Sequence, residues 1–235
     1  MLKYFAIFFA LFVLVKSQTI NWGSRACIVN RNAYYTGIMQ EAITKIEREL
    51  GWSNFKLEDL NFDINLALFK WQVRGYANYT NGFVVSMRSM DINNILSSFS
   101  SRTVDGVPVN EVNVRGSLNL RNLTIGYDVS ANLEDTGTHR FTGVYMFSLV
   151  TFQCAAIKNL DTNEASATAA ITSSTGARRM EYLPHDSVSE VLSRDFLPRL
   201  LWDSFVNWAT DIFVPYIREA ALHAELPEIR YDYSC

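Results

Sequence analysis

The sequence predicts an α+β fold in which a long, strongly curved antiparallel sheet wraps around an N-terminal helix and a long C-terminal helix. Three observations predict it: a helical repeat of apolar residues near the start of the chain, strand-like alternation through its middle, and a second helical repeat near its end. Neither an internal repeat nor a linker divides the sequence. We therefore expect a single domain at residues 18–235, after a signal peptide at residues 1–17.

The first residues have the pattern of a secretory signal. Lys3 precedes an uninterrupted apolar run from Tyr4 to Val15, and small or modest residues follow it. This run is too short to span a bilayer core of about 30 Å, which needs about 20 apolar residues. We expect cleavage near Gln18, and hence a secreted, extracellular protein without a stable membrane anchor.

The first helix is predicted at residues 34–50. Its apolar residues recur three or four positions apart, polar residues occupy the opposite side, and Gly51 ends the helix. The apolar side consists of Ile38, Met39, Ala42, Ile43, Ile46 and Leu50.

Strand-like alternation follows this helix. Residues 62–68 alternate, and the pattern changes phase at Phe69 and continues to Val73, which we interpret as one bent strand. Turns are predicted at 79–82, 104–108 and 134–138, each of which contains a glycine. Further strands are predicted at 83–87, at 140–157 and, as a weaker strand of small side chains, at 163–174.

The longest strand is predicted at residues 112–133. Its apolar residues fall on even numbers up to Leu120 and on odd numbers from Leu123, and the switch at Arg121 and Asn122 contains no tight-turn sequence. A one-residue phase change turns the buried face over unless a bulge or a sharp twist absorbs it. We therefore expect a long, bent strand in a sheet that curls around something.

The last quarter of the chain returns to the helical period. Ser187 and Glu190 have the spacing of a capping box, and Asp195 is predicted to cap a further helix with Pro198 in its first turn. That helix continues almost to the end of the chain, and Pro215 is expected to kink it.

Three cysteines, in a secreted chain, allow one disulfide and leave one thiol over, and the sequence alone does not fix the pairing. Cys154 lies in the middle of an apolar strand, so we expect it to be the buried thiol and favour Cys27 with Cys235 as the pair. Asn78 and Asn122 begin N-glycosylation sequons, and the alternation places Asn78 on the outer face of its strand.

Charge and motifs argue against several function classes. The formal net charge is −3 at pH 7 and the longest basic cluster is Arg178-Arg179, which disfavours nucleic acid and anionic membrane surfaces as partners. His139, His185 and His223 have no partner at a telling spacing, and no catalytic, phosphate-binding or metal-binding motif occurs. We expect neither an enzyme nor a cofactor or metal.

Two long segments, SLNLRNLTIGYDVSANL and HRFTGVYMFSLVTFQCAAI, resemble the paired strands of insect juvenile-hormone-binding and takeout-like proteins. The order of signal, helix at YYTGIMQEAITKIEREL, strands and helix at LPRLLWDSFVNWATDIFVPYIREAALHAEL resembles the group 7 mite allergens and their arthropod relatives still more closely. Both belong to the tubular lipid-binding (TULIP) superfamily. The resemblance is one of pattern and order over nearly all of the mature chain. The hormone binders carry two cysteines near the mature N-terminus, where this chain has Cys27.

The resemblance implies a TULIP-like half-barrel with an apolar tunnel that binds a lipid or another elongated hydrophobic small molecule. The candidate lining residues are Ile43, Ile46, Leu50, Leu118, Leu120, Ile125, Tyr127, Val129, Phe205, Trp208 and Ile212. One alternative stays open: apolar stripes at the period of their element fill a solid core by default. In that case the protein is a secreted interaction module, for microbial lipid or a protein partner, without internal cargo.

Overall fold

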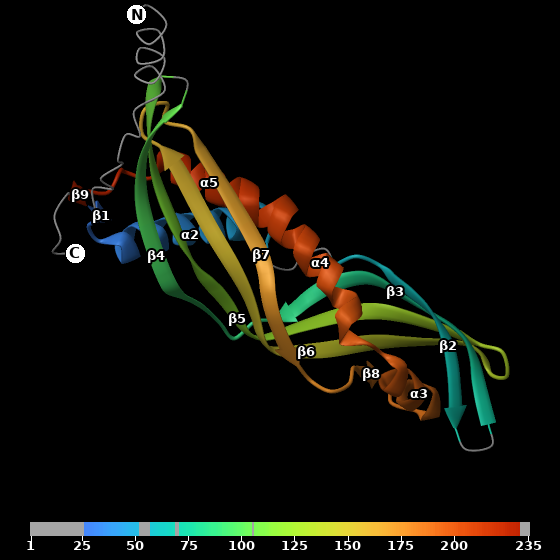
Figure 1. Cartoon of the computed structure of the whole chain (residues 1–235). Helices are drawn as coiled ribbons and strands as arrows, with labels where there is room; N and C mark the ends of the chain where they lie inside the picture. Colours follow the sequence, from blue (N-terminus) through green and yellow to red (C-terminus); the bar gives the residue numbers. More distant parts are fainter. Residues whose placement is uncertain (1–25, 52–56, 69–70, 105, 231–235) are drawn as a thin grey trace, which may run out of the picture.

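The computed structural model describes residues 26–51, 57–68, 71–104 and 106–230. They form an α+β structure in which a seven-stranded antiparallel sheet packs against an N-terminal helix and a long C-terminal helical region (Figure 1). The N-terminal helix, α2 (Arg31–Glu49), lies beside the last helix, α5 (Val214–His223). This arrangement confirms the predicted fold class, whereas the strong curvature of the sheet stays a prediction.

The seven strands make two halves of one sheet. They are β2 (Leu60–Leu68), β3 (Trp71–Ser86), β4 (Ser89–Val104), β5 (Val107–Leu133), β6 (Gly137–Asn159), β7 (Ala165–Gly176) and β8 (Glu181–Leu183). β5 and β6 run through both halves. In the α2 half they pair with β4 and β7, and in the other half, which we call the α3 half after the helix described below, they pair with β3 and β8. β2 completes the α3 half by pairing with β3.

The phase change predicted in the longest strand is confirmed. Along β5 the buried apolar side chains fall on even numbers up to Leu120 and on odd numbers from Leu123, and Asn122 between them has a φ of 49°. β6 switches phase opposite to it, between the buried residues Phe147 and Val150, and the β5–β6 register is the same on both sides. Asparagine tolerates this left-handed conformation better than other residues with a side chain.

Two predictions about the earlier strands are wrong. The turn expected at 79–82 is an irregularity within β3, where Asn81 has a φ of 53° and the register shifts between Thr80 and Phe83. The strand expected to continue through Phe69 ends instead, because Leu68 pairs with Trp71 and the chain reverses between β2 and β3. Phe69 itself lies outside the described residues. A phase change in a sequence fits either a bulge or a reversal of the chain, so alternation alone does not separate the two.

The other predicted turns, and the strands predicted at 112–133, 140–157 and 163–174, agree with the structure, whereas β4 and β8 were not predicted. β4 and β5 meet at the pair of Val104 with Val107, and β5 and β6 meet at the pair of Leu133 with Gly137. β7, expected as a weak strand or an edge, lies at an edge of the sheet.

Helix α2 has the predicted termination and buried side. It begins at Arg31, three residues earlier than expected, because Asn30 takes a left-handed conformation with a φ of 56°. It ends before Gly51, whose φ is 66°. Its buried residues are Tyr35, Ile38, Met39, Ala42 and Ile46.

The C-terminal region consists of a short helix, α3 (Ser187–Asp195), and a long helical run, as predicted. The run passes through the 3-10 turn η2 (Pro198–Leu201), α4 (Trp202–Asn207), the π-helical turn η3 (Trp208–Phe213) and α5 without a break, because the residues at which these segments join all have right-handed helical φ and ψ. The capping box of α3 consists of Asp186 and Ser189, one residue before the predicted pair, and Asp195 is the last residue of α3 instead of a cap. Pro215 lies within the long helical run, just after the π-helical turn η3, so the proline that cannot donate a helical hydrogen bond coincides with an irregularity of the helix.

The two ends of the described chain meet. β1 (Cys27–Ile28) pairs with β9 (Ile229–Arg230), which places the backbone of Cys27 opposite that of Arg230. Cys235, the predicted disulfide partner of Cys27, lies outside the described residues. Cys154 is buried with a free thiol, as predicted.

Candidate ligand-binding interior

The predicted lining residues lie on the helix-facing side of the sheet or on the helices that cover it. Those that are buried are Ile46, Leu118, Leu120, Ile125, Tyr127, Val129, Phe205 and Trp208. Those that are partly buried and pack against the core are Ile43, Leu50 and Ile212. The structure therefore brings the predicted residues together in one apolar interior.

Aromatic rings connect the two halves of this interior. The ring of Phe205 on α4 lies 5.2 Å from that of Phe147 and 6.3 Å from that of Phe152, measured between centroids. Phe147 and Phe152 lie on opposite sides of the phase change in β6. Both halves of the sheet consequently present their apolar side to the same helical region.

The α2 half contains a close approach between a tyrosine and a glycine. A Cβ atom at Gly116 would lie 2.6 Å from Cε1 of Tyr35, so a side chain at this position would displace the ring. The Tyr35 hydroxyl lies 3.2 Å from the carbonyl oxygen of Gly116 and 3.1 Å from that of Cys154, to which it donates. Burial raises the pKa of the Tyr35 hydroxyl and raises that of the Cys154 thiol to about 12. Both groups are therefore neutral and inert in the folded protein.

The α3 half contains a cluster of aromatic side chains around Tyr79. Its ring centroid lies 5.1 Å from that of Phe62, 5.6 Å from Phe196, 6.0 Å from Tyr127 and 6.4 Å from Tyr182. The hydroxyl oxygens of Tyr79 and Tyr182 are 2.5 Å apart, and burial raises the pKa of both groups. Sequence reasoning identified Tyr127 alone from this cluster, since the others come from segments far apart in the chain.

Lys158 is a charged exception among the buried residues. Its ammonium group donates to the carbonyl oxygens of Leu222 and Ala224, each at 2.9 Å, at the C-terminal end of α5. A cation at this end complements the helix dipole, and burial lowers the pKa of the amine. Lys158 thus fastens the end of α5 to the sheet.

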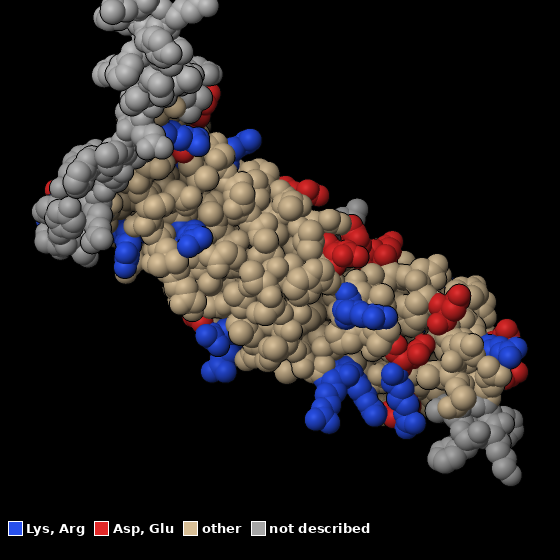
Figure 2. All heavy atoms as spheres, in the orientation of Figure 1, with Lys and Arg blue, Asp and Glu red and all other residues tan. Residues whose placement is uncertain are grey.

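Described residues also form surface grooves. One of about 650 Å³ lies between α5 and the ends of β6 and β7, and is lined by Glu111, Ile157, Asn159, Asn163, Glu164, Ala165, Ser166, Arg218, Glu219 and Leu222. Grooves of about 530 and 480 Å³ lie in the α3 half. Of the predicted lining residues, Val129 borders one of these three grooves. Figure 2 shows charges of both signs on the visible face, separated by broad uncharged areas.

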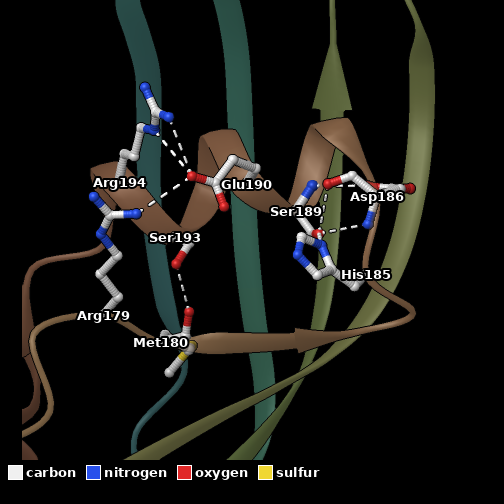
Figure 3. A network of polar contacts seen from close by, with 8 residues as sticks. All are labelled: Arg179, Met180, His185, Asp186, Ser189, Glu190, Ser193 and Arg194. Carbon is white, nitrogen blue, oxygen red and sulfur yellow. Dashed lines mark hydrogen bonds and ion pairs between the residues drawn. The ribbon is translucent and has the colours of Figure 1, made fainter.

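Two histidines of the described chain, His139 and His185, make contacts with neighbouring hydroxyl groups. Nδ1 of His185 lies 3.2 Å from the hydroxyl of Ser189, within the capping box of α3 (Figure 3). Nε2 of His139 lies 3.0 Å from the hydroxyl of Thr136. Among the described residues, no group of three or more His, Cys, Asp or Glu side chains is placed to hold a metal ion. No helix in this part of the chain is long and apolar enough to cross a membrane.

Comparison with known proteins finds similarity to solved structures and none to family models or curated proteins. No family model matches the sequence, and no curated protein matches it. Among solved structures the chain is similar to the crystal structure of lipopolysaccharide binding protein, with a TM-score of 0.40 and 13% sequence identity. The match covers 82% of this chain and 41% of that one, so the chain spans less than half of that protein's length.

Proposed function

We propose that the protein is a secreted, non-enzymatic binding protein that holds lipids or other elongated hydrophobic molecules between its sheet and its helices. The observation that supports this proposal is the single apolar interior that extends through both halves of the sheet. Burying apolar surface contributes about 25 cal/mol per Å², so a long hydrocarbon chain gains most from an interior of this shape.

Ligand entry requires part of the helical layer to move, because the lining residues pack against one another. Helix α3 is separated from the long helical run by Phe196 and Leu197, whose backbone is extended. Helix α3 is therefore able to move from the sheet without unfolding the run that follows it. A hydrocarbon chain then takes the place of the side chains that covered the inner face.

Two variants with enlarged lining residues test this proposal. In protein stripped of bound lipid, we expect Leu120→Trp and Ile125→Trp to reduce binding of a fluorescent fatty acid, because the indole occupies the space of the ligand. Arg115→Trp is the matched control, since Arg115 lies on the same strand with its side chain exposed. The proposal fails if the wild-type protein takes up no hydrophobic probe, or if the control weakens uptake as much as the interior variants do.

The secreted location has a separate test. The mature protein recovered from its own secretions should begin near Gln18, because the apolar run before it has the length of a signal and not of a membrane span. N-terminal sequencing measures this directly. An intact N-terminus at Met1 would contradict the proposed secretion.

A second function, an interaction module with a filled core, is supported by an exposed apolar strip. Leu197 before η2 is 45% exposed, and Trp202 and Val206 of α4 are each 37% exposed. Trp202 and Val206 are neighbours on one helix face because they lie four residues apart. If stripped wild-type protein takes up no probe, while Trp202→Ser abolishes its association with a partner or with itself, this second function replaces the first.

A further inference from the structure

The hydroxyl groups of Tyr79 and Tyr182 form a hydrogen-bonded pair in which one of the two O–H groups has no acceptor among the described residues. The two oxygens are 2.5 Å apart, and the residues are 0% and 5% exposed. Each hydroxyl carries one hydrogen, and a bond between the two uses one of them. The described residues offer neither hydroxyl a second hydrogen-bond partner. One buried O–H donor is therefore left without an acceptor.

This arrangement differs from that of other buried tyrosines in the same interior. The hydroxyl of Tyr127 donates to the carbonyl oxygen of Glu58 at 3.2 Å, and that of Tyr145 donates to the carbonyl oxygen of Ala177 at 2.6 Å. Buried donors are nearly always satisfied, and one left unsatisfied costs more than an ordinary hydrogen bond contributes. A missing acceptor at this place is consistent with a molecule that supplies one.

A carboxylate that acts electrostatically on both hydroxyls favours one kind of acceptor. Asp195 is the last residue of α3, has no ion pair among the described residues, and its negative charge contributes to raising the pKa of both hydroxyls. Desolvation raises the pKa of the Asp195 carboxyl as well. A second anion close to this carboxylate would be repelled, so an uncharged oxygen fits the place better.

From these contacts we propose that the Tyr79–Tyr182 hydroxyl pair binds an uncharged oxygen acceptor, such as an ester or ketone carbonyl, at the polar end of the hydrophobic ligand. This inference rests on the proposed function and adds to it the class of ligand. The free hydrogen of the pair donates to the ligand oxygen, while Phe62, Tyr127 and Phe196 surround the adjoining hydrocarbon.

Helix α3 packs against β8, the strand that contains Tyr182, and polar contacts fasten this helix (Figure 3). The hydroxyl of Ser193 donates to the carbonyl oxygen of Met180 at 2.7 Å, and Glu190 pairs with Arg179 at 3.3 Å and with Arg194 at 3.2 Å. The paired side chains are about half exposed, and ion pairs of this kind contribute little to stability. Because Phe196 directly follows α3, displacement of α3 moves its ring away from Tyr79 and opens space beside the hydroxyls.

The test compares an ester with a hydrocarbon of equal length. Methyl palmitate and octadecane, which have the same number of atoms along the chain, compete for a fluorescent hydrophobic dye on the full chain stripped of lipid, in wild-type protein and in the double variant Tyr79→Phe/Tyr182→Phe. We expect the double variant to lose about twofold to tenfold in affinity for the ester and to keep its affinity for the alkane. Each single variant should keep part of the ester preference, because the remaining hydroxyl has its hydrogen free to donate. Tyr145→Phe is the control, since its hydroxyl already donates to the carbonyl oxygen of Ala177 and its ring is not among those that surround the ligand.

The outcomes separate the two proposals. An unchanged ratio of ester to alkane affinity in the double variant overturns the hydroxyl anchor and leaves the carrier function standing. Uptake of neither probe by wild-type protein overturns the carrier function. If the double variant does not fold, the infrared carbonyl stretch of ¹³C-labelled ester bound to wild-type protein decides. We expect a shift to lower frequency than in alkane, and an unshifted band contradicts the anchor.

Discussion

Replacing Phe205 by alanine tests the packing between the helical layer and both halves of the sheet. Phe205 is 1% exposed, and its ring contacts Phe147 and Phe152 from the two sides of the phase change. Truncating a fully buried phenylalanine costs about 3–5 kcal/mol, through lost burial and the cavity left behind. We expect the free energy of unfolding to fall by this amount in urea titrations monitored by tryptophan fluorescence.

The same variant links packing to binding. A long hydrophobic ligand should fill the new cavity and bind the folded state alone, so saturating ligand should restore part of the lost stability by mass action. Val206→Ala is the matched control, because Val206 follows Phe205 on α4 and its side chain is 37% exposed. Truncating the Val206 side chain should lower the free energy of unfolding by well below about 1 kcal/mol. Equal losses for the two variants, or a loss below about 1 kcal/mol for Phe205→Ala, would refute the assignment of Phe205 to the interior.

Four further predictions concern the cysteines and the glycans. Burial raises the pKa of the Cys154 thiol to about 12, so this thiol should resist alkylating reagents at pH 8 until urea unfolds the chain. Because the pKa of this thiol is higher in the folded state than in the unfolded state, its contribution to the free energy of unfolding should be fully present below the unfolded-state pKa of about 8.5 and fall as the pH rises above it. Urea titrations between about pH 7 and 10 measure this fall. Peptide mapping without reduction should recover Cys27 linked to Cys235, since β1 and β9 bring the chain ends together; a Cys154 linkage would contradict this. Glycosidase treatment should reveal glycan on Asn78 more fully than on Asn122, because Asn78 lies on the opposite face of β3 from the buried Ala77 and Tyr79, and an unmodified Asn78 would contradict this prediction.

The alternation of side chains was sufficient to predict the long central strands. The phase change at Asn122 appears in the structure as predicted, because a residue with a left-handed conformation lets the apolar face stay on one side. The same reasoning predicted one bent strand where the chain reverses between Leu68 and Trp71, since a bulge and a hairpin both produce the same phase change in the alternation. Pairing partners are set by contacts across the sheet, which one strand's sequence does not contain.

The edge strands β4 and β8 were the least predictable part of the fold. β4 (Ser89–Val104) was not predicted, because Ser97, Ser98, Ser100 and Ser101 give it little apolar alternation, and it is held by its pairing with β5. β8 was too short to give a pattern.

The candidate interior was predictable in outline and not in its polar detail. Residues at a regular period, such as Leu120 and Ile125, could be assigned to the inner face from spacing alone. The pair of Tyr79 with Tyr182 joins residues 103 positions apart, and nothing in either local sequence distinguishes them from other tyrosines. Such a pair becomes visible when the backbone brings β3 and β8 to the same end of the sheet.

Mass spectrometry of an organic extract tests the central claim most directly. The protein is purified from its own secretions, without detergent, and the extract is compared with that of an equal amount of a secreted control protein. We predict one class of elongated hydrophobic molecule in near-stoichiometric amount, carrying an uncharged oxygen at one end. An extract with no such molecule, together with stripped protein that takes up no fluorescent fatty acid, would contradict the account of this interior as a ligand-binding site.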